Sequence, residues 1–369
     1  MIAFLLAKPT QFDAPFFQWL HTYRPDMPFT VYYWKPVENS ADTDTETGAS
    51  LTWGINLLSG YPWQFVDPDN PRPFGKELRK QQVRYLVCNG WKHGFKKLIA
   101  AAKHQRIPMG LRIDSVLWGK SAVEIQIRRL MLKGAYRPFS QFFSSGSICD
   151  KYLIAMNIPP MRWRRWPYCV DNEFFSPNPQ ILAKAAGLKK QFGLTDDPVF
   201  LGICKWVPRE NPMELLEAFV ALNNPDLQLV MIGDGPLRPK LEALRKQYPH
   251  LKIIFPGYVP YVTLPAWYAC AKVFVHPAAY EPWGVSVQEA IAAGCSVVAS
   301  SRVGSSYDLI EQGINGFQYK AGSVETLSKC MRQALTLDPG FKAQSNRQML
   351  EKWSYETIAA ALIIPDKSY

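Results

Sequence analysis

Short apolar runs alternate with amphipathic segments throughout the second half of the chain. Each run is almost entirely apolar, and the segments between the runs place apolar residues at helical spacing. Nearly continuous apolar runs are typical of parallel strands that helices cover on both faces, and their alternation with helical patterns indicates βαβ units. The predicted strands are residues 199–204, 227–233, 251–257, 273–277 and 296–300.

The first half repeats this alternation less regularly, with apolar runs such as IAFLLA and RYLVCN and a helical pattern in FKKLIAAAKHQ. The prolines and asparagines of NEFFSPNPQ, residues 172–180, interrupt the pattern and predict a domain junction. We therefore predict an α/β chain of two doubly wound domains, residues 1–175 and 176–345. Residues 346–369 are expected to form a helical tail that packs back on the N-terminal domain.

Length and composition agree with this division. A chain of 369 residues exceeds the size at which one core usually keeps growing, and its 47% hydrophobic and 20% charged residues are typical of globular proteins. The seven cysteines form no C-x-x-C pair, which favours reduced thiols in the cytosol over a disulfide framework or a zinc site. No apolar run reaches the length of a membrane span, and we interpret MIAFLLA as a first strand, not a signal peptide.

Positive charge is concentrated in the first half of the chain. The net charge is +11, and residues 72–106 hold ten Lys/Arg against the single acid Glu77. A solvated basic face would explain this stretch, and so would contact with an anionic membrane surface or an acidic acceptor. Nucleic acid is not an expected partner, because no recognised binding motif accompanies the charge.

Two glutamates stand out in the apolar stretch YEPWGVSVQEAIAAGCSVVAS, residues 280–300. Glu281 falls in the loop after a predicted strand and Glu289 in the helix that follows, with Gly284 between them. A buried carboxylate normally requires a partner, and this stretch contains no basic residue. The amide end of the helix suits a phosphate, while the carboxylates suit hydroxyl groups. A sugar nucleotide offers both.

Several segments around these glutamates resemble the GT4 family of retaining glycosyltransferases, which have the GT-B fold of two Rossmann-like domains facing across a cleft. EPWGVSVQE resembles the E-x7-E motif of that family. The resemblance extends, in the same order, over residues 195–335 and is looser in the first domain. Its other segments are FLGICKWVPRENPMELLEAF, LVMIGDGPL, FPGYVP and SRVGSSYDLIEQGINGFQY.

The resemblance implies a transferase that uses a nucleotide-sugar donor, and it assigns roles to individual residues. Glu289 would hold the ribose hydroxyls and Glu281 a hydroxyl of the donor sugar. Lys205, assisted by Arg209, would neutralise the diphosphate as it leaves. The acceptor would be a glycan, a glycolipid or a small molecule. Further donor contacts would come from backbone groups of Trp283, Gly284, Val285, Gly257 and Tyr258.

The sequence departs from the family in two ways that bear on activity. The first domain lacks the glycine pair that many relatives carry after their first strand. The second basic position of the family falls on Glu210, whose carboxylate would repel a diphosphate. The alternative hypothesis is therefore a nucleotide-sugar-binding protein with weak or lost transferase activity. An epimerase of similar fold is a further alternative, but the histidine pattern of such enzymes is missing.

Three residues of the first domain are candidates for the acceptor side or the cleft. His93 follows a predicted strand and is a further catalytic candidate, while Arg112 and Asp114 end another strand. We expect no cofactor and no obligatory metal, because no D-x-D pair ends a strand; the DTD of residues 42–44 remains an alternative. We expect a cytoplasmic protein, with peripheral contact to the inner face of the membrane as an open possibility.

Overall fold

The computed structural model describes residues 1–35, 41–43, 46, 50–52 and 54–362. The described residues form two compact units. The first contains residues up to Lys35, residues 56–169 and the chain from Tyr355 onward; the second contains the described part of residues 41–55 and residues 170–354. Compared with the predicted domain limits, the second unit begins slightly earlier and also takes in the segment around Glu46.

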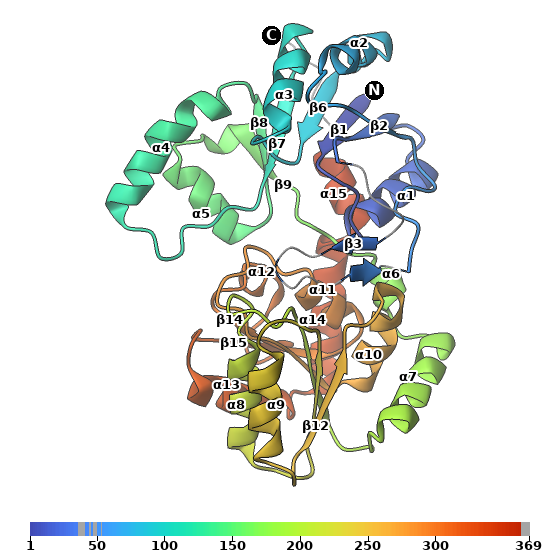
Figure 1. Cartoon of the computed structure of the whole chain (residues 1–369), viewed down its shortest axis with the longest axis vertical. Coiled ribbons are helices and arrows are strands. Elements are labelled where there is room, and N and C mark those ends of the chain that lie inside the picture. The colour runs from blue at the N-terminus through green and yellow to red at the C-terminus, as the bar shows by residue number, and fades with distance from the viewer. Residues whose placement is uncertain (36–40, 44–45, 47–49, 53, 363–369) are drawn as a thin grey trace. The chain divides into compact units, whose positions relative to one another are not determined.

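The first unit is built on a parallel sheet with the strand order β5-β2-β1-β6-β7-β8-β9. Helix α15 packs on α1 within this unit (Figure 1). Its described elements are β1 (Ile2–Leu6), α1 (Asp13–Tyr23), β2 (Phe29–Tyr33), β5 (Trp63–Phe65), α2 (Arg72–Lys80), β6 (Tyr85–Cys88), α3 (Phe95–His104), β7 (Met109–Ile113), α4 (Ala122–Tyr136), β8 (Gln141–Ser144), α5 (Ser147–Ala155), the 3-10 turn Pro160–Arg162, β9 (Trp163–Arg165) and α15 (Tyr355–Ala361).

The second unit holds a parallel sheet in the order β12-β11-β10-β13-β14-β15 and a separate antiparallel pair, β3 with β4. Its described elements are β3 (Ala41–Thr43), β4 (Ser50–Thr52), α6 (Asn172–Phe175), α7 (Pro179–Phe192), β10 (Val199–Ile203), α8 (Pro212–Leu222), β11 (Gln228–Ile232), α9 (Arg238–Lys246), β12 (Lys252–Gly257), the 3-10 turn Tyr261–Thr263, α10 (Leu264–Cys270), β13 (Val273–His276), α11 (Ser286–Ala292), β14 (Ser296–Ser300), α12 (Ser306–Leu309), β15 (Gly316–Tyr319), α13 (Val324–Ala334) and α14 (Pro339–Lys352).

The apolar runs became strands because helices cover both faces of each sheet. Every residue of β2, β11 and β14 is buried, which explains why these strands read as continuous apolar runs without alternation. The five strands predicted for the second half correspond to β10–β14. Strand β15, GFQY, was not predicted, because its glycine and glutamine weaken the apolar pattern.

Both sheets reverse their strand order at one point, between β1 and β6 in the first unit and between β10 and β13 in the second. In an open parallel sheet, ligands bind outside the carboxyl ends of the strands at such a switch point. The loops that follow β10 and β13 are therefore the place where a ligand of the second unit is expected.

Among the described residues, no helix combines the length and the hydropathy that crossing a membrane would require.

Candidate functional site

Two loops of the second unit bring charged side chains together at the switch point of its sheet. The first loop joins β10 to α8 and carries Lys205, Arg209 and Glu210; the second joins β13 to α11 and carries Glu281. Strands β10 and β13 are hydrogen-bonded neighbours, so these loops leave the same edge of the sheet side by side. The fold thus assembles, from separate segments, the charges that sequence reasoning assigned to a donor site.

The two basic side chains of the first loop converge on one carboxylate. Lys205 Nζ donates to Glu46 Oε2 at 2.8 Å, and Arg209 Nη2 donates to the same oxygen at 3.2 Å. These hydrogen bonds lower the pKa of Glu46 below its usual value. A carboxylate oxygen held by two cations shows that this place accommodates an oxyanion, which is the chemistry that a diphosphate requires.

Glu210 is buried beside Arg209, whose Nη2 lies 2.8 Å from Glu210 Oε1. Burial and the nearby carboxylate of Glu281 raise the pKa of Glu210 to about 7. The role of Arg209 beside Lys205 at the leaving diphosphate stays a prediction. The side chain of Arg209 reaches both Glu46 and Glu210, and its Nη1 also donates to Tyr280 O at 3.3 Å.

Glu281 lies in the middle of the second loop and is partly exposed. Its Oε2 lies 3.6 Å from Arg209 Nη1, and its Oε1 accepts a hydrogen bond from the Trp283 amide at 3.3 Å. A backbone bridge to Val303 fixes the position of the residue, with Glu281 N donating to Arg302 O at 2.9 Å. The carboxylate is therefore held near the cations, but it also occupies an amide that we expected to meet the ligand.

His276, the last residue of β13, was not singled out by sequence reasoning. It is buried, and burial together with the Arg209 charge lowers its pKa to about 4, so the imidazole is neutral at physiological pH. A Cβ atom added at Gly284 would lie 3.1 Å from His276 Nε2 and 3.2 Å from Glu281 Cγ. Gly284, with a φ of +89°, thus lets the turn pass close to both side chains.

Glu289 is buried within α11, where its Oε2 accepts a hydrogen bond from Tyr268 Oη at 2.7 Å. Burial raises the pKa of Glu289 to about 7, and the Tyr268 hydrogen bond opposes that shift. The helix begins at Ser286 and ends at Ala292, so Glu289 lies within it as predicted. A buried acid with one neutral partner is consistent with a binding role, which stays a prediction.

The remaining donor candidates lie at turns of the second unit. Val285 precedes the first residue of α11, and Gly257 ends β12 with a φ of +85°. Gly257 O accepts from Gly233 N at 3.0 Å, which ties the β12 turn to the GDGP turn, and Tyr258 is partly exposed. Their proposed contacts with the nucleotide remain predictions.

Of the three candidates of the first unit, Arg112 and Asp114 interact electrostatically. Arg112 is buried and donates to Asp13 Oδ1 at 2.8 Å and to Pro167 O at 2.9 Å, so its main partner is Asp13. Asp114 is exposed, and His93 is exposed in the turn before α3. The close pairing with Asp13 supports a structural role for Arg112; the acceptor-side and cleft roles of these residues stay predictions.

Comparison with known proteins gives a family match within the second half of the chain. Residues 187–356 match the family described as "Glycosyl transferases group 1". Related sequences include a GDP-mannose-dependent alpha-(1-6)-phosphatidylinositol monomannoside mannosyltransferase of Mycolicibacterium smegmatis, 29% identical over 53% of this chain and 54% of the relative. Sulfoquinovosyl transferase SQD2 of Arabidopsis thaliana is 31% identical over 47% of this chain and 32% of the relative. The matches span about half or less of these curated relatives.

Solved structures resemble the whole chain and confirm the predicted GT-B fold class. Anabaena Alr3699/HepE in complex with UDP aligns with a TM-score of 0.74 and 17% identity over 98% of each chain. A glycosyltransferase from Rickettsia africae ESF-5 aligns with a TM-score of 0.74 and 13% identity, over 98% of this chain and 96% of the other. At such identities the likeness shows the fold alone.

Proposed function

We propose that the chain is a glycosyltransferase that moves a sugar from a nucleoside-diphosphate sugar to an acceptor hydroxyl, with retention of configuration. One observation carries the proposal: Lys205 and Arg209 converge on a single oxyanion, Glu46 Oε2, at the switch point of the sheet. The names of the relatives, which include enzymes that use GDP-mannose, support the same chemistry. The chain spans only part of those relatives, so the donor is proposed as a class.

The proposed reaction breaks the bond between the anomeric carbon and the diphosphate oxygen. Lys205 and Arg209 stabilise the negative charge that develops on the leaving diphosphate. The acceptor hydroxyl forms the new bond on the same face of the sugar, and its proton passes to the departing phosphate oxygen. Glu281 positions the donor sugar through a hydroxyl, and Glu289 positions the ribose. This scheme uses side-chain cations and requires no obligatory metal, which an assay with and without a chelator tests.

The first experiment measures donor binding and turnover in the full chain. A thermal-shift panel of UDP, GDP, ADP and TDP identifies the base, and the matching nucleotide sugars are then tested for slow release of nucleotide. We expect release in the wild type and its loss in Glu281→Ala, with Glu217→Ala on the exposed face of α8 as the matched control. NMR of the product anomer tests retention.

Tight binding of a nucleotide sugar that is never cleaved to free nucleotide, even in the presence of sugar acceptors, would favour the alternative function of a binding protein. Interconversion of donor sugars without an acceptor would favour an epimerase. Absence of nucleotide binding in the whole panel would overturn the proposal.

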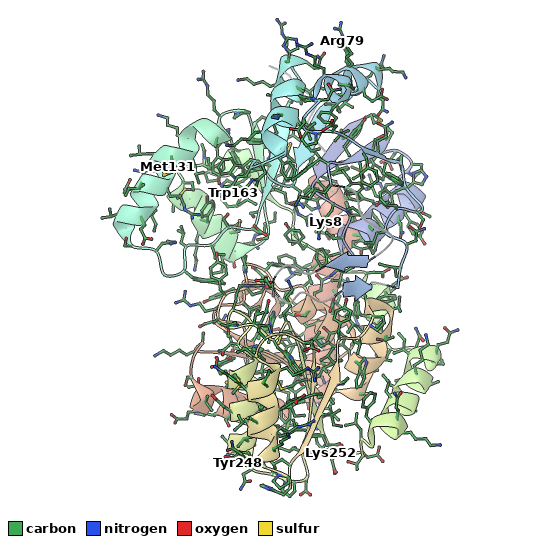
Figure 2. All side chains as sticks on the ribbon, viewed as in Figure 1. Lys8, Arg79, Met131, Trp163, Tyr248 and Lys252 are labelled. Atoms are coloured by element: carbon green, nitrogen blue, oxygen red, sulfur yellow. The ribbon has the colours of Figure 1, made fainter. Side chains whose placement is uncertain are left out.

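We further propose that the acceptor lies at an anionic membrane surface, with α4 as the contact. Large apolar side chains on this helix are exposed at positions that share one face: Val123, Ile127, Leu130 and Met131. Figure 2 labels Met131 on the helix. Basic residues Arg128 and Lys133 flank this face, and Arg137 follows the last residue of the helix. Exposed apolar residues flanked by cations are typical of helices that lie in the headgroup region of anionic bilayers.

This location differs from the basic stretch 72–106 suggested by the sequence, where apolar residues of α2 and α3 such as Phe74 and Leu98 are buried in the core. Co-sedimentation with vesicles of neutral lipid, with and without anionic lipid, tests the two locations. We expect pelleting with anionic vesicles to fall at least tenfold in Ile127→Ser/Leu130→Ser. The control Leu182→Ser/Phe341→Ser removes equally exposed apolar side chains elsewhere and should pellet normally.

A loss of pelleting in Arg79→Glu/Lys80→Glu on α2, with full pelleting in the α4 variant, would assign the contact to residues 72–106. No pelleting of the wild type at low salt would overturn the membrane proposal.

A further inference from the structure

Three neighbouring strands of the first unit are each followed by a lysine at the same edge of the sheet. Strands β2, β1 and β6 lie side by side and run parallel, and Lys35, Lys8 and Lys92 come soon after their ends. Figure 2 labels Lys8. The strand order reverses between β1 and β6, so these lysines lie at the switch point of the first sheet, where an open parallel sheet binds its ligands.

The register of β1 and β2 sets two of these lysines opposite each other. Leu6 pairs with Tyr33 at the end of the two strands. The ladder continues past them, because Lys35 N donates to Ala7 O at 2.8 Å. Lys8 and Lys35 therefore occupy opposed positions. Like charges at opposed positions of neighbouring strands repel each other, and an anion bound beside them relieves that repulsion.

A tryptophan precedes two of the lysines and restricts the ammonium group. Lys35 Nζ lies 5.1 Å from the ring centroid of Trp34, and Lys92 Nζ lies 5.2 Å from that of Trp91. Cation–π contacts of this kind hold a side chain that would otherwise move freely in solvent. Neither Lys35 nor Lys92 forms an ion pair with any residue in the described part of the chain. No internal carboxylate therefore neutralises these two charges.

The loop after β6 also contacts the segment after β2. A Cβ atom added at Gly94 would lie 2.7 Å from Trp34 Cε3, so the loop backbone lies directly against the Trp34 ring. His93, the residue before this glycine, has a φ of +51°. A left-handed backbone at a residue other than glycine costs free energy, and such residues cluster at functional sites. Lys92, which precedes this turn, and Lys35, which follows Trp34, therefore belong to one surface.

We propose that Lys8, Lys35 and Lys92 bind a phosphate group of the acceptor, so that the chain transfers sugar to phosphorylated acceptors. This inference rests on the proposed function, since it names the acceptor class of the same reaction. Lysine ammonium groups bind phosphates as point charges, and a phosphate monoester carries up to about two negative charges at neutral pH. Asp114 follows β7, the strand next to β6, and is placed to contact a hydroxyl of that acceptor. The phosphate belongs either to a soluble sugar or polyol phosphate or to a lipid headgroup.

The first test measures phosphate binding without any transfer. Every protein in it carries Lys205→Ala/Arg209→Ala, which removes the two cations that the proposed donor site offers to a phosphate. Inorganic phosphate is titrated at low ionic strength, where screening is weak, and binding is followed by the width of the ³¹P resonance. We expect one saturable site, with affinity reduced at least tenfold when Lys35→Gln/Lys92→Gln is added.

The matched control adds Lys80→Gln/Lys103→Gln, which removes the same charge from the last turns of α2 and α3. These turns lead into the amino ends of β6 and β7, away from the proposed site, so affinity should stay within twofold. Absence of saturable binding, or an equal loss of affinity in both double variants, would overturn the proposal. Phosphate binding as expected, with no nucleotide binding in the thermal-shift panel, would instead overturn the proposed transferase and leave the phosphate site.

The second test measures transfer and identifies the source of the phosphate. Glycerol is compared with glycerol 3-phosphate, and neutral vesicles are compared with vesicles that contain phosphatidylglycerol. We expect kcat/KM to be at least tenfold higher for a phosphorylated acceptor, and KM for that acceptor to rise at least tenfold in Lys35→Gln/Lys92→Gln. A preference for glycerol 3-phosphate would indicate a soluble acceptor, and a preference for the phosphatidylglycerol vesicles a lipid headgroup. Equal kcat/KM with and without the phosphate would overturn the proposal.

Discussion

Each unit places an arginine and nearby carboxylates at the carboxyl ends of its parallel strands, but the two groups differ in burial. In the first unit the side chains of Arg112 and Asp13 are only 5% and 6% exposed, and the guanidinium also lies over the rings of Trp166 and Tyr168. In the second unit Lys205 and Arg209 are 38% and 34% exposed, and both contact the half-exposed Glu46.

This difference separates a structural ion pair from a candidate binding site. A buried pair whose opposite charges already match each other is expected to affect stability more than binding. A partly exposed group of cations and acids with perturbed pKa values can exchange an internal partner for a ligand. Substitutions in the buried pair of the first unit should therefore change folding, and substitutions in the charged group of the second should change binding and transfer.

The largest expected effect is the loss of stability in Arg112→Ala. This substitution leaves the Asp13 carboxylate buried without its cation, which typically costs about 3–5 kcal/mol. Urea unfolding measures the change. Arg24→Ala is the control, because the Arg24–Asp26 pair is partly exposed, with Asp26 at 61%, and should cost less than about 1 kcal/mol. Equal stability of the two variants would contradict the structural role of Arg112.

The second prediction concerns Lys205→Ala. Removing one group that stabilises a leaving diphosphate should lower kcat by about 10²–10³-fold. The free energy of unfolding should change by less than about 0.5 kcal/mol, because the side chain is partly exposed. Steady-state transfer assays and urea unfolding measure the two quantities. An unchanged kcat, or a loss of activity explained by unfolding of Lys205→Ala, would contradict the proposal that the charged group of the second unit acts in binding and transfer.

The sequence predicted the elements of the second unit better than the contacts between them. The apolar runs located β10–β14, since strands covered on both faces need apolar residues at every position. The loop position of Glu281 and the helix position of Glu289 followed from the same pattern. Glu46 falls within the predicted first domain, residues 1–175, because nothing local indicates that it clusters with the second unit.

Partners far apart in sequence could not be predicted. Asp114 is the nearest acid to Arg112, yet the buried hydrogen bond goes to Asp13, 99 positions away. His276 looks like any polar residue at the end of a strand until the turn at Gly284 brings it close to Glu281. Such contacts depend on strand order and loop path, which residue periodicity does not encode.

The third prediction concerns pH and Glu289. Burial raises the pKa of Glu289 from 4.5 to about 7 in the folded chain, so the carboxyl favours folding below pH 4.5 and this contribution is lost as the pH rises through 7. Glu289→Gln stays neutral and should be more stable than the wild type at pH 8, by roughly 2–3 kcal/mol, and nearly equal at pH 4. Urea unfolding at both pH values tests this. Glu210 titrates in both proteins, so its effect cancels in the difference.

If the free energies of unfolding of the wild type and Glu289→Gln differ by the same amount at pH 4 and pH 8, ionisation of Glu289 does not destabilise the fold. If Glu289→Gln also loses nucleotide affinity, the Glu289 carboxyl destabilises the fold but is needed to bind the ligand. That result would sharpen the contrast with the Arg112–Asp13 pair, in which the buried charges are already matched.

The smallest expected effect belongs to Glu46→Gln. The Glu46 carboxylate occupies the donors of Lys205 and Arg209 that the proposal assigns to the diphosphate, so it should compete with the nucleotide. Its side chain is 40% exposed, and an exposed pair contributes at most about 1 kcal/mol. We expect nucleoside-diphosphate affinity to rise by about two- to fivefold at low salt and the gain to shrink at high salt, because ions screen the competition.

Calorimetric titration at two salt concentrations measures the effect of Glu46→Gln, with Asp26→Asn, an acid of the first unit, as the control. A gain confined to Glu46→Gln would mean that the carboxylate holds the two cations in place until a stronger oxyanion displaces it. Equal affinities at low salt would mean that the diphosphate does not use the oxygen position now taken by Glu46. Lys205, Arg209 and Glu46 would then form a structural ion-pair cluster, as Arg112 and Asp13 form a structural ion pair in the first unit.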